Sequence, residues 1–143
     1  MPSDPAGPIT ARCYCGASRL TLDKPPFTVA YCHCSDCRRW TGAPVAAFAA
    51  FDRADVIAQL PDAFRGTAGV ERWTCPTCHA PLGAAFDYLP DQIYVPIGVI
   101  DQAEQLAPAM HSHAGNTLPW LHIKDDLPRA DASARDALNT VVE

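Results

Sequence analysis

The chain has 143 residues, enough to bury one hydrophobic core, and we expect a single domain. Its formal net charge of −5 comes from an acidic excess scattered along the chain, so no basic stripe could follow a phosphate backbone, and nucleic acid is not an expected partner. We also find no basic, apolar leader and no apolar stretch of bilayer length. The sequence therefore predicts a cytoplasmic protein that has no membrane partner.

The chain carries seven cysteines, and they fall into three close-spaced groups. Thiols stay reduced in the cytoplasm, where cysteines this close together more often hold a metal than each other. A disulfide framework is the alternative. The odd number of cysteines argues against it, and so does the strained ring that Cys13 would close with Cys15.

The first cysteine group is predicted at the tip of a β-hairpin. Residues 1–8 contain several prolines and are expected to form a flexible lead. Residues 9–22 then favour two short strands around a turn at Cys15 and Gly16. This turn would present the side chains of Cys13 and Cys15 together.

The central cysteine group follows the next predicted strand. A strand over residues 27–31 would deliver Cys32 at its end, and Ser35 or Asp36 could cap a single helical turn after it. The apolar run over residues 45–51 best fits a buried strand, with a buried helix as the alternative.

The third cysteine group lies between two further predicted strands. Residues 52–66 favour strand fragments and turns, and strands over 70–74 and 82–86 would enclose the tight turn that holds Cys75 and Cys78. Additional elements are strands over 92–99 and 108–113 and an exposed helix over 131–142. Since 14 prolines and 8 glycines disfavour long helices, the predicted fold class is mainly β.

A count of ligands divides the seven cysteines into two metal sites. Structural zinc takes four protein ligands, whereas a reactive zinc takes three and keeps one position open. The two flanking pairs make one closed site, and the central group makes one open site. The closed site would use Cys13, Cys15, Cys75 and Cys78, and the open site would use Cys32, Cys34 and Cys37.

The charge of the central group favours a thiol as the fourth ligand. Three thiolates already over-neutralise Zn²⁺, so a water bound there should ionise less easily than on a three-histidine zinc. A further soft thiolate suits such a metal better. Arg38 and Arg39 follow the group directly and could bind a carboxylate of that thiol, although solvent or Asp36 could equally be their partner.

Other residues leave alternatives open. A histidine could complete the central group into a second structural site, and the candidates are His79, His111, His113 and His122. His33 is expected on the opposite face of the chain, and the central group could also be a reduced cluster without metal. If His111 and His113 share one strand face, they could transfer protons. The tryptophans expected in the core are Trp40, Trp73 and Trp120.

The order of these motifs resembles the glutathione-dependent formaldehyde-activating enzyme family. The resemblance rests on Cys13-x-Cys15-Gly16, Cys32-His33-Cys34-Ser35-Asp36-Cys37-Arg38, Cys75-x-x-Cys78 with Pro81-Leu82, Val95-x-Ile97-Gly98, Trp120 and Asp126-Leu127-Pro128. It covers residues 9–129, which we take as one zinc-binding domain, and leaves a tail over 130–143. His79 stands where members commonly have glycine, and residues 110–113 also depart from the usual pattern.

The resemblance implies a small, mainly β fold of the Mss4-like kind with two zinc ions per chain. One zinc would be structural, on the two outer pairs, and the other would be labile and catalytic, on the central group. The implied activity is that of a carbon-sulfur lyase, which adds glutathione or a similar thiol to formaldehyde or a related electrophile. The alternative function is a zinc-stabilised protein-binding module in which both metals are structural. The oligomeric state stays open.

Overall fold

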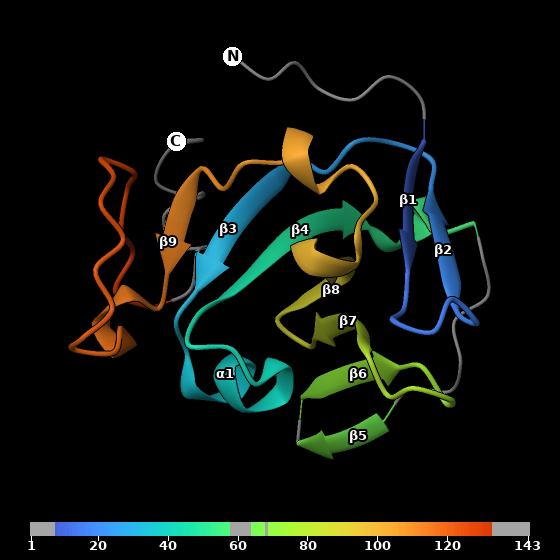
Figure 1. Cartoon of the computed structure of the whole chain (residues 1–143), viewed down its shortest axis with the longest axis horizontal. Coiled ribbons are helices and arrows are strands. Elements are labelled where there is room, and N and C mark those ends of the chain that lie inside the picture. The colour runs from blue at the N-terminus through green and yellow to red at the C-terminus, as the bar shows by residue number, and fades with distance from the viewer. Residues whose placement is uncertain (1–7, 58–63, 68, 133–143) are drawn as a thin grey trace. The chain divides into compact units, whose positions relative to one another are not determined.

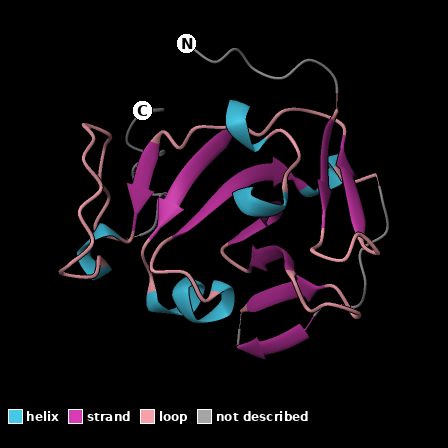
Figure 2. Ribbon diagram, viewed as in Figure 1, coloured by secondary structure: helices cyan, strands magenta, loops and turns pink. Residues whose placement is uncertain are grey.

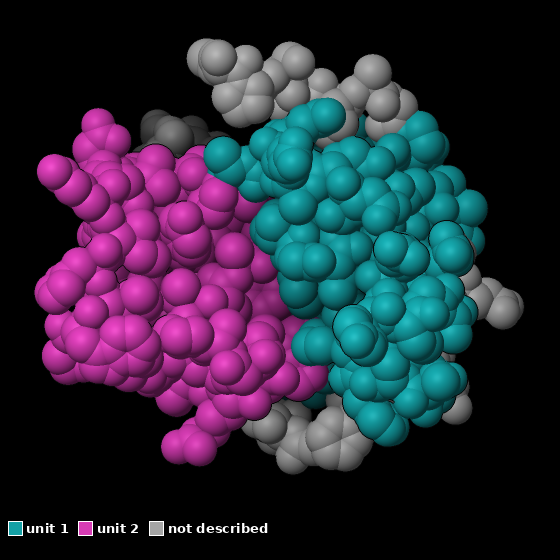
Figure 3. All heavy atoms as spheres, viewed as in Figure 1, with its two compact units in different colours: residues 1–28, 49–107 teal, residues 29–48, 108–143 magenta. Residues whose placement is uncertain are grey.

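The structure, a computed structural model, describes residues 8–57, 64–67 and 69–132 of the chain. The chain divides into two compact units, which Figure 3 colours separately. Unit 1 combines residues 1–28 with 49–107, and unit 2 combines residues 29–48 with 108–143. Strands dominate the described elements, as Figure 2 shows, so the predicted mainly β fold class is confirmed.

Unit 1 begins with the expected hairpin. Strands β1 (Ile9–Arg12) and β2 (Arg19–Leu22) are antiparallel, and their alternate apolar side chains are buried. The turn between them passes through Gly16, whose φ of 83° lies in the left-handed region that glycine adopts without strain. The turn is closed by the amide of Cys13, which donates to the carbonyl of Ser18 over 3.0 Å.

A second set of antiparallel strands in unit 1 belongs to a different sheet from the hairpin of β1 and β2. In order they are β5 (Phe64–Thr67), β6 (Val70–Thr74), β7 (Pro81–Phe86) and β8 (Leu89–Pro96), labelled in Figure 1. The strand predicted over residues 92–99 ends early, because residues 97–99 form a 3₁₀ turn (η2, Ile97–Val99). Pro96 has no amide hydrogen with which to continue the ladder, so the strand ends there.

Unit 2 is built on two parallel strands and one helix. Strand β3 (Thr28–Cys32) pairs with β9 (Met110–Ser112), so that Cys32 lies opposite Ser112. The helix α1 (Ser35–Thr41) follows β3 after a two-residue link. The buried strand β4 (Ala46–Asp52) runs from unit 2 into unit 1, and its extended conformation settles the choice between strand and helix for residues 45–51.

The cap of α1 differs from the predicted one. Cys34, with extended φ and ψ of −64° and 149°, is the N-cap, and its Sγ accepts from the amide of Cys37 over 3.3 Å. The expected caps, Ser35 and Asp36, are the first two residues of the helix instead. The prediction was wrong because serine and aspartate are the commoner caps, whereas here a thiol accepts the hydrogen bond. The helix ends at Gly42, which takes a φ of 73°.

The tryptophans are less buried than predicted. Trp73 is 5% exposed and belongs to the core, and Trp40 is half-buried and stacks on Phe48 with a ring separation of 6.2 Å. Trp120 is 63% exposed, so its assignment to the core was wrong. It lies in a segment, residues 117–128, that forms no strand or helix of its own.

The remaining described elements are short 3₁₀ turns. They are η1 (Arg53–Asp55), η3 (Ala103–Gln105) and η4 (Ala114–Asn116). The flexible lead and the C-terminal helix were predicted over residues that lie mostly outside the described part, and the single domain over 9–129 stays a prediction. No helix in the described part of the chain has the length and apolar character that crossing a bilayer requires.

Candidate metal centres

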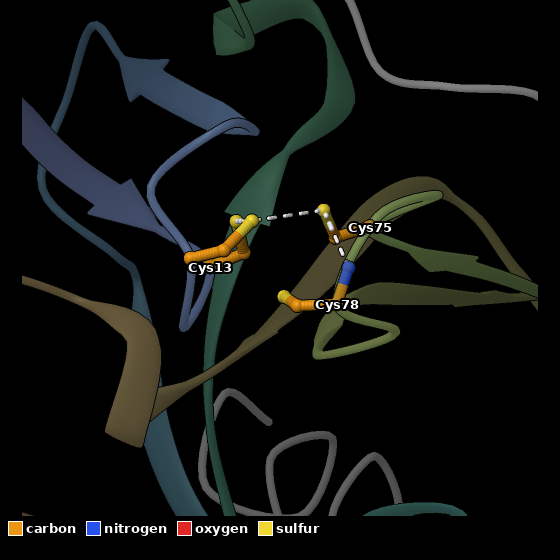
Figure 4. Close-up of side chains that lie close together, drawn as sticks. Cys13, Cys75 and Cys78 are labelled. Atoms are coloured by element: carbon orange, nitrogen blue, oxygen red, sulfur yellow. Dashed lines mark hydrogen bonds between the residues drawn. The ribbon is translucent and has the colours of Figure 1, made fainter.

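Four thiols of unit 1 converge on one point. Their ligand atoms all lie within 4.8 Å of one another, and Figure 4 shows three of the four side chains by label; the cluster is Cys13, Cys15, Cys75 and Cys78. The Sγ atoms of Cys13 and Cys15 are 3.6 Å apart, and those of Cys15 and Cys75 are 3.8 Å apart. A tetrahedral zinc with Zn–S bonds of about 2.3 Å requires sulfurs about 3.8 Å apart. The spacing of these sulfurs is therefore compatible with a zinc ion.

Backbone amides donate to two of these sulfurs, those of Cys13 and Cys75, and favour their anionic form. The amide of Ser18 donates to Sγ of Cys13 over 3.2 Å, and the amide of Thr77 donates to Sγ of Cys75 over 3.4 Å. A hydrogen bond from the Ser18 side chain, together with the amides of Cys78 and Thr77, lowers the pKa of Cys75 to about 5. Hydrogen bonds to the charged form favour it, and a thiolate is the form that binds metal.

His79 takes an unusual backbone conformation beside this cluster. Its φ is 64°, in the left-handed region, and its amide donates to the carbonyl of Cys75 over 2.8 Å. Glycine adopts this conformation freely, whereas the side chain of a histidine makes it unfavourable. His79 does not join the four thiols, so its assignment as a possible ligand gains no support.

Three thiols of unit 2 form the central cluster. The ligand atoms of Cys32, Cys34 and Cys37 all lie within 4.8 Å of one another, and the Sγ atoms of Cys32 and Cys34 are 3.4 Å apart. Cys32 ends β3, Cys34 caps α1, and Cys37 lies in the first turn of the helix. Among the described residues, no histidine, aspartate or glutamate adds a fourth ligand atom.

The central cluster concentrates negative charge on one sulfur. Hydrogen bonds from Cys32 and Cys37 lower the pKa of Cys34 far below the ordinary range of a thiol. The same contact with Cys34 raises the pKa of Cys32 to about 11, and the contact with Cys32 raises that of Cys37. One thiolate therefore opposes ionisation of its neighbours, and a bound cation would remove this opposition.

A buried chain of side chains begins beside the central cluster. Nε2 of His33 lies 2.8 Å from Nδ1 of His111, and Nε2 of His111 lies 2.9 Å from Oδ2 of Asp125. Oδ1 of Asp125 pairs with Arg129 at 2.9 Å. Burial lowers the pKa of His33, and positive charge on a protonated His111, on Arg129 and on Arg38 lowers it further. His33 does not belong to the group formed by the three thiols.

The condition under which His111 and His113 could transfer protons together, a shared strand face, is not met. His111 is on β9, but His113 follows the strand with a φ of 53°, so the two do not alternate along one extended segment. Sequence analysis missed Asp125 and Arg129 as partners of a histidine. No periodicity connects them with His33, and only the motif Asp126-Leu127-Pro128 of the resemblance marked the segment.

A cavity of about 530 Å³ lies along α1. Its lining residues include Ser35, Arg38, Arg39 and Leu118. Nε of Arg38 is buried and has no hydrogen-bond partner among the described residues. The two arginines predicted to bind a carboxylate therefore line one cavity, next in sequence to the central thiols.

The model of the family described as "Glutathione-dependent formaldehyde-activating enzyme" matches residues 8–116. The chain belongs to this family. The resemblance noted from its cysteine motifs is thereby confirmed.

One solved structure supports the same fold in this member of the glutathione-dependent formaldehyde-activating enzyme family. A crystal structure of a protein from Rhodobacter sphaeroides superposes with a TM-score of 0.51 at 20% sequence identity, over 85% of this chain and 99% of that chain. At this identity the likeness concerns the fold alone. No curated protein matches the sequence.

Proposed function

We propose that the chain is a zinc-dependent enzyme that binds glutathione or a similar thiol and adds it to formaldehyde or a related aldehyde. This is the activity of a carbon-sulfur lyase in the synthetic direction. One observation carries the proposal: three thiols converge at Cys32, Cys34 and Cys37 without a fourth ligand atom among the described residues. The four-thiol cluster, by contrast, is complete and suits a structural zinc.

The donor set defines the chemistry of the open position. A zinc ion bound there would supply a soft Lewis acid that keeps the sulfur of the substrate in its thiolate form at neutral pH. Cys34 is the most readily ionised of the three thiols, so it would provide the first anionic ligand. Cys32 and Cys37 would release their protons as the cation binds.

The cavity along α1 supports a carboxylate-bearing thiol as the substrate. Its volume of about 530 Å³ falls within the roughly 300–1,000 Å³ of pockets that hold drug-sized ligands. Leaving the buried Nε of Arg38 without an acceptor is costly, and a carboxylate of the substrate would satisfy it. Arg39 would offer a second guanidinium to the same ligand. Glutathione carries two carboxylates and one thiol.

The reaction needs no redox partner. The thiol loses its proton, the sulfur lone pair forms a bond to the carbonyl carbon, and the π electrons of the carbonyl move to oxygen, which takes up a proton. The product is a hydroxymethyl thioether that contains all the atoms of the two substrates. Since reduced thiols are required, we place the enzyme in the cytoplasm.

Cobalt substitution tests the proposal directly. Adding glutathione to the Co²⁺-loaded protein should change the visible absorption of the metal in wild type but not in Cys34→Ser. Serine still caps α1, because its hydroxyl can accept the amide of Cys37, so the variant should fold. Arg38→Gln should weaken the response to glutathione, whereas Arg19→Gln, a surface change in β2, should not. If glutathione leaves the visible spectrum of the Co²⁺-loaded wild type unchanged, the protein-binding module would be favoured instead.

A further inference from the structure

A second cavity, of about 220 Å³, lies within unit 2. It is lined by histidine rings, apolar side chains and two cationic residues, and none of its lining residues is acidic. The histidines and the cationic residues of the lining include His33, His111, Lys124 and Arg129. The cavity shares no lining residue with the one along α1, and it is smaller than pockets for drug-sized ligands. Only a small molecule fits.

The charge around this cavity suits a monoanion. Arg129 is matched by Asp125, with 2.9 Å between Nη1 and Oδ1, and its guanidinium also donates to the carbonyls of Leu127 and Ile123. The other oxygen of Asp125 accepts from His111. Lys124 is exposed and has no ion pair among the described residues. One positive charge therefore remains for a ligand.

The hydrogen-bond chain behind the cavity has one direction when both histidine rings are neutral. The carboxylate of Asp125 only accepts, so Nε2–H of His111 donates to it. In the neutral ring Nδ1 of His111 then carries a lone pair, and Nε2–H of His33 must donate to it. Nδ1 of His33 is consequently an acceptor. It is buried and has no partner among the described residues.

A buried acceptor without a donor is uncommon in native proteins and often indicates a missing water or ligand. His33 is 2% exposed and is one of the residues that line the cavity. An occupant with a hydroxyl group could donate to Nδ1 directly or through one water. Its carboxylate would meet the charge of Lys124.

We propose that this cavity binds a small hydroxycarboxylate, with the carboxylate beside Lys124 and the hydroxyl directed to His33. The inference goes beyond the proposed function, because it uses neither the thiol cluster nor Arg38 and Arg39. The ligand class follows from the cavity volume, the single unmatched charge and the orphaned acceptor.

Calorimetric titration of the full zinc-loaded chain with glycolate and acetate tests the proposal. Glycolate should bind, and acetate, which lacks the hydroxyl, should bind about fivefold more weakly. Lys124→Gln should weaken glycolate binding about fivefold or more. Lys24→Gln removes the same charge from a lysine of unit 1 that lines neither cavity, so it should bind glycolate as wild type does.

Several outcomes would overturn the inference. The first is that glycolate shows no saturable binding. The second is that acetate binds with the same affinity as glycolate. The third is that Lys124→Gln and Lys24→Gln lose the same amount of affinity for glycolate. If Lys124→Gln weakened the binding of glutathione as much as the binding of glycolate, the cavity would belong to the thiol site and the inference would fail. If glycolate bound as expected while glutathione left the cobalt spectrum unchanged, the inference would stand and the proposed function would fail.

Discussion

Nε2 of His33 lies 2.8 Å from Nδ1 of His111, although the two residues are 78 positions apart in the sequence. His33 stands between two thiols of the central cluster, and His111 is on β9, so the contact ties the cluster to the neighbouring strand of unit 2. Both rings are at most 2% exposed. Water has little access to either ring, so each of these two nitrogens has the other as its hydrogen-bond partner.

Replacing His111 by Phe should destabilise the protein by about 1–3 kcal/mol, because an aromatic ring of similar shape leaves Nε2–H of His33 without a partner. Urea unfolding of the zinc-loaded protein measures the change. His122→Phe is the matched control, since His122 is exposed, and it should alter stability by less than about 0.5 kcal/mol. Equal effects of the two variants would show that the buried contact contributes nothing.

The hydrogen bond between His111 and Asp125 should make the stability of the folded protein sensitive to acid. A hydrogen bond from His111, aided by the Leu127 amide and Arg129, lowers the pKa of Asp125. A carboxyl group with a lowered pKa in the folded state stabilises it above the pKa of the unfolded state, about 3.9 for aspartate, and this contribution is lost as the pH falls through the folded-state pKa. Stability should therefore decline more steeply below about pH 4 in wild type than in Asp125→Asn.

Metal release at low pH affects every variant, so the comparison needs a neighbouring control. Asp126→Asn removes the same charge from the adjacent exposed position and should keep the acid dependence of wild type. Thermal unfolding between pH 3 and pH 7 measures both variants. Parallel curves for Asp125→Asn and wild type would contradict the prediction.

The sequence and the structure agree where local chemistry decides the result. Spacings of two and three residues bring the thiols of each group together in tight turns, which predicts the central cluster, and the count of four ligands for a structural zinc predicts that the two outer pairs meet. The contact of His33 with His111 could not be predicted, because it depends on the parallel pairing of β3 with β9, which no local pattern encodes. The capping thiol of Cys34 was missed for a different reason, since propensities favour serine and aspartate at that position.

Replacing His79 by glycine should stabilise the protein, because it removes the cost of a left-handed backbone conformation at a residue with a side chain. A left-handed conformation costs a non-glycine residue about 1–2 kcal/mol, and glycine loses about 0.5–1 kcal/mol more conformational free energy on folding than alanine does. His79→Gly should therefore raise the free energy of unfolding by up to about 1 kcal/mol, measured in urea. His79→Val, whose branched side chain tolerates this conformation poorly, should lower it. Stabilisation by valine would show that φ is not the cause.

The two thiol clusters should differ in how firmly they hold metal. Purified in the presence of zinc, the chain should contain about two zinc ions, and dialysis against a mild chelator should leave about one, because four thiolates enclose the outer metal and three leave the central one open. Elemental analysis before and after dialysis measures this. Two ions that resist the chelator would indicate two closed sites, and one ion throughout would leave the central cluster without metal.

Cysteine variants assign each ion to its cluster. Cys75→Ser should unfold much of the protein, because a structural zinc can supply about 10 kcal/mol of folding free energy in small domains. Cys34→Ser should keep the circular dichroism of wild type and about one chelator-resistant zinc. If Cys34→Ser unfolds the chain as fully as Cys75→Ser does, the central cluster is structural and the division between the two sites is wrong.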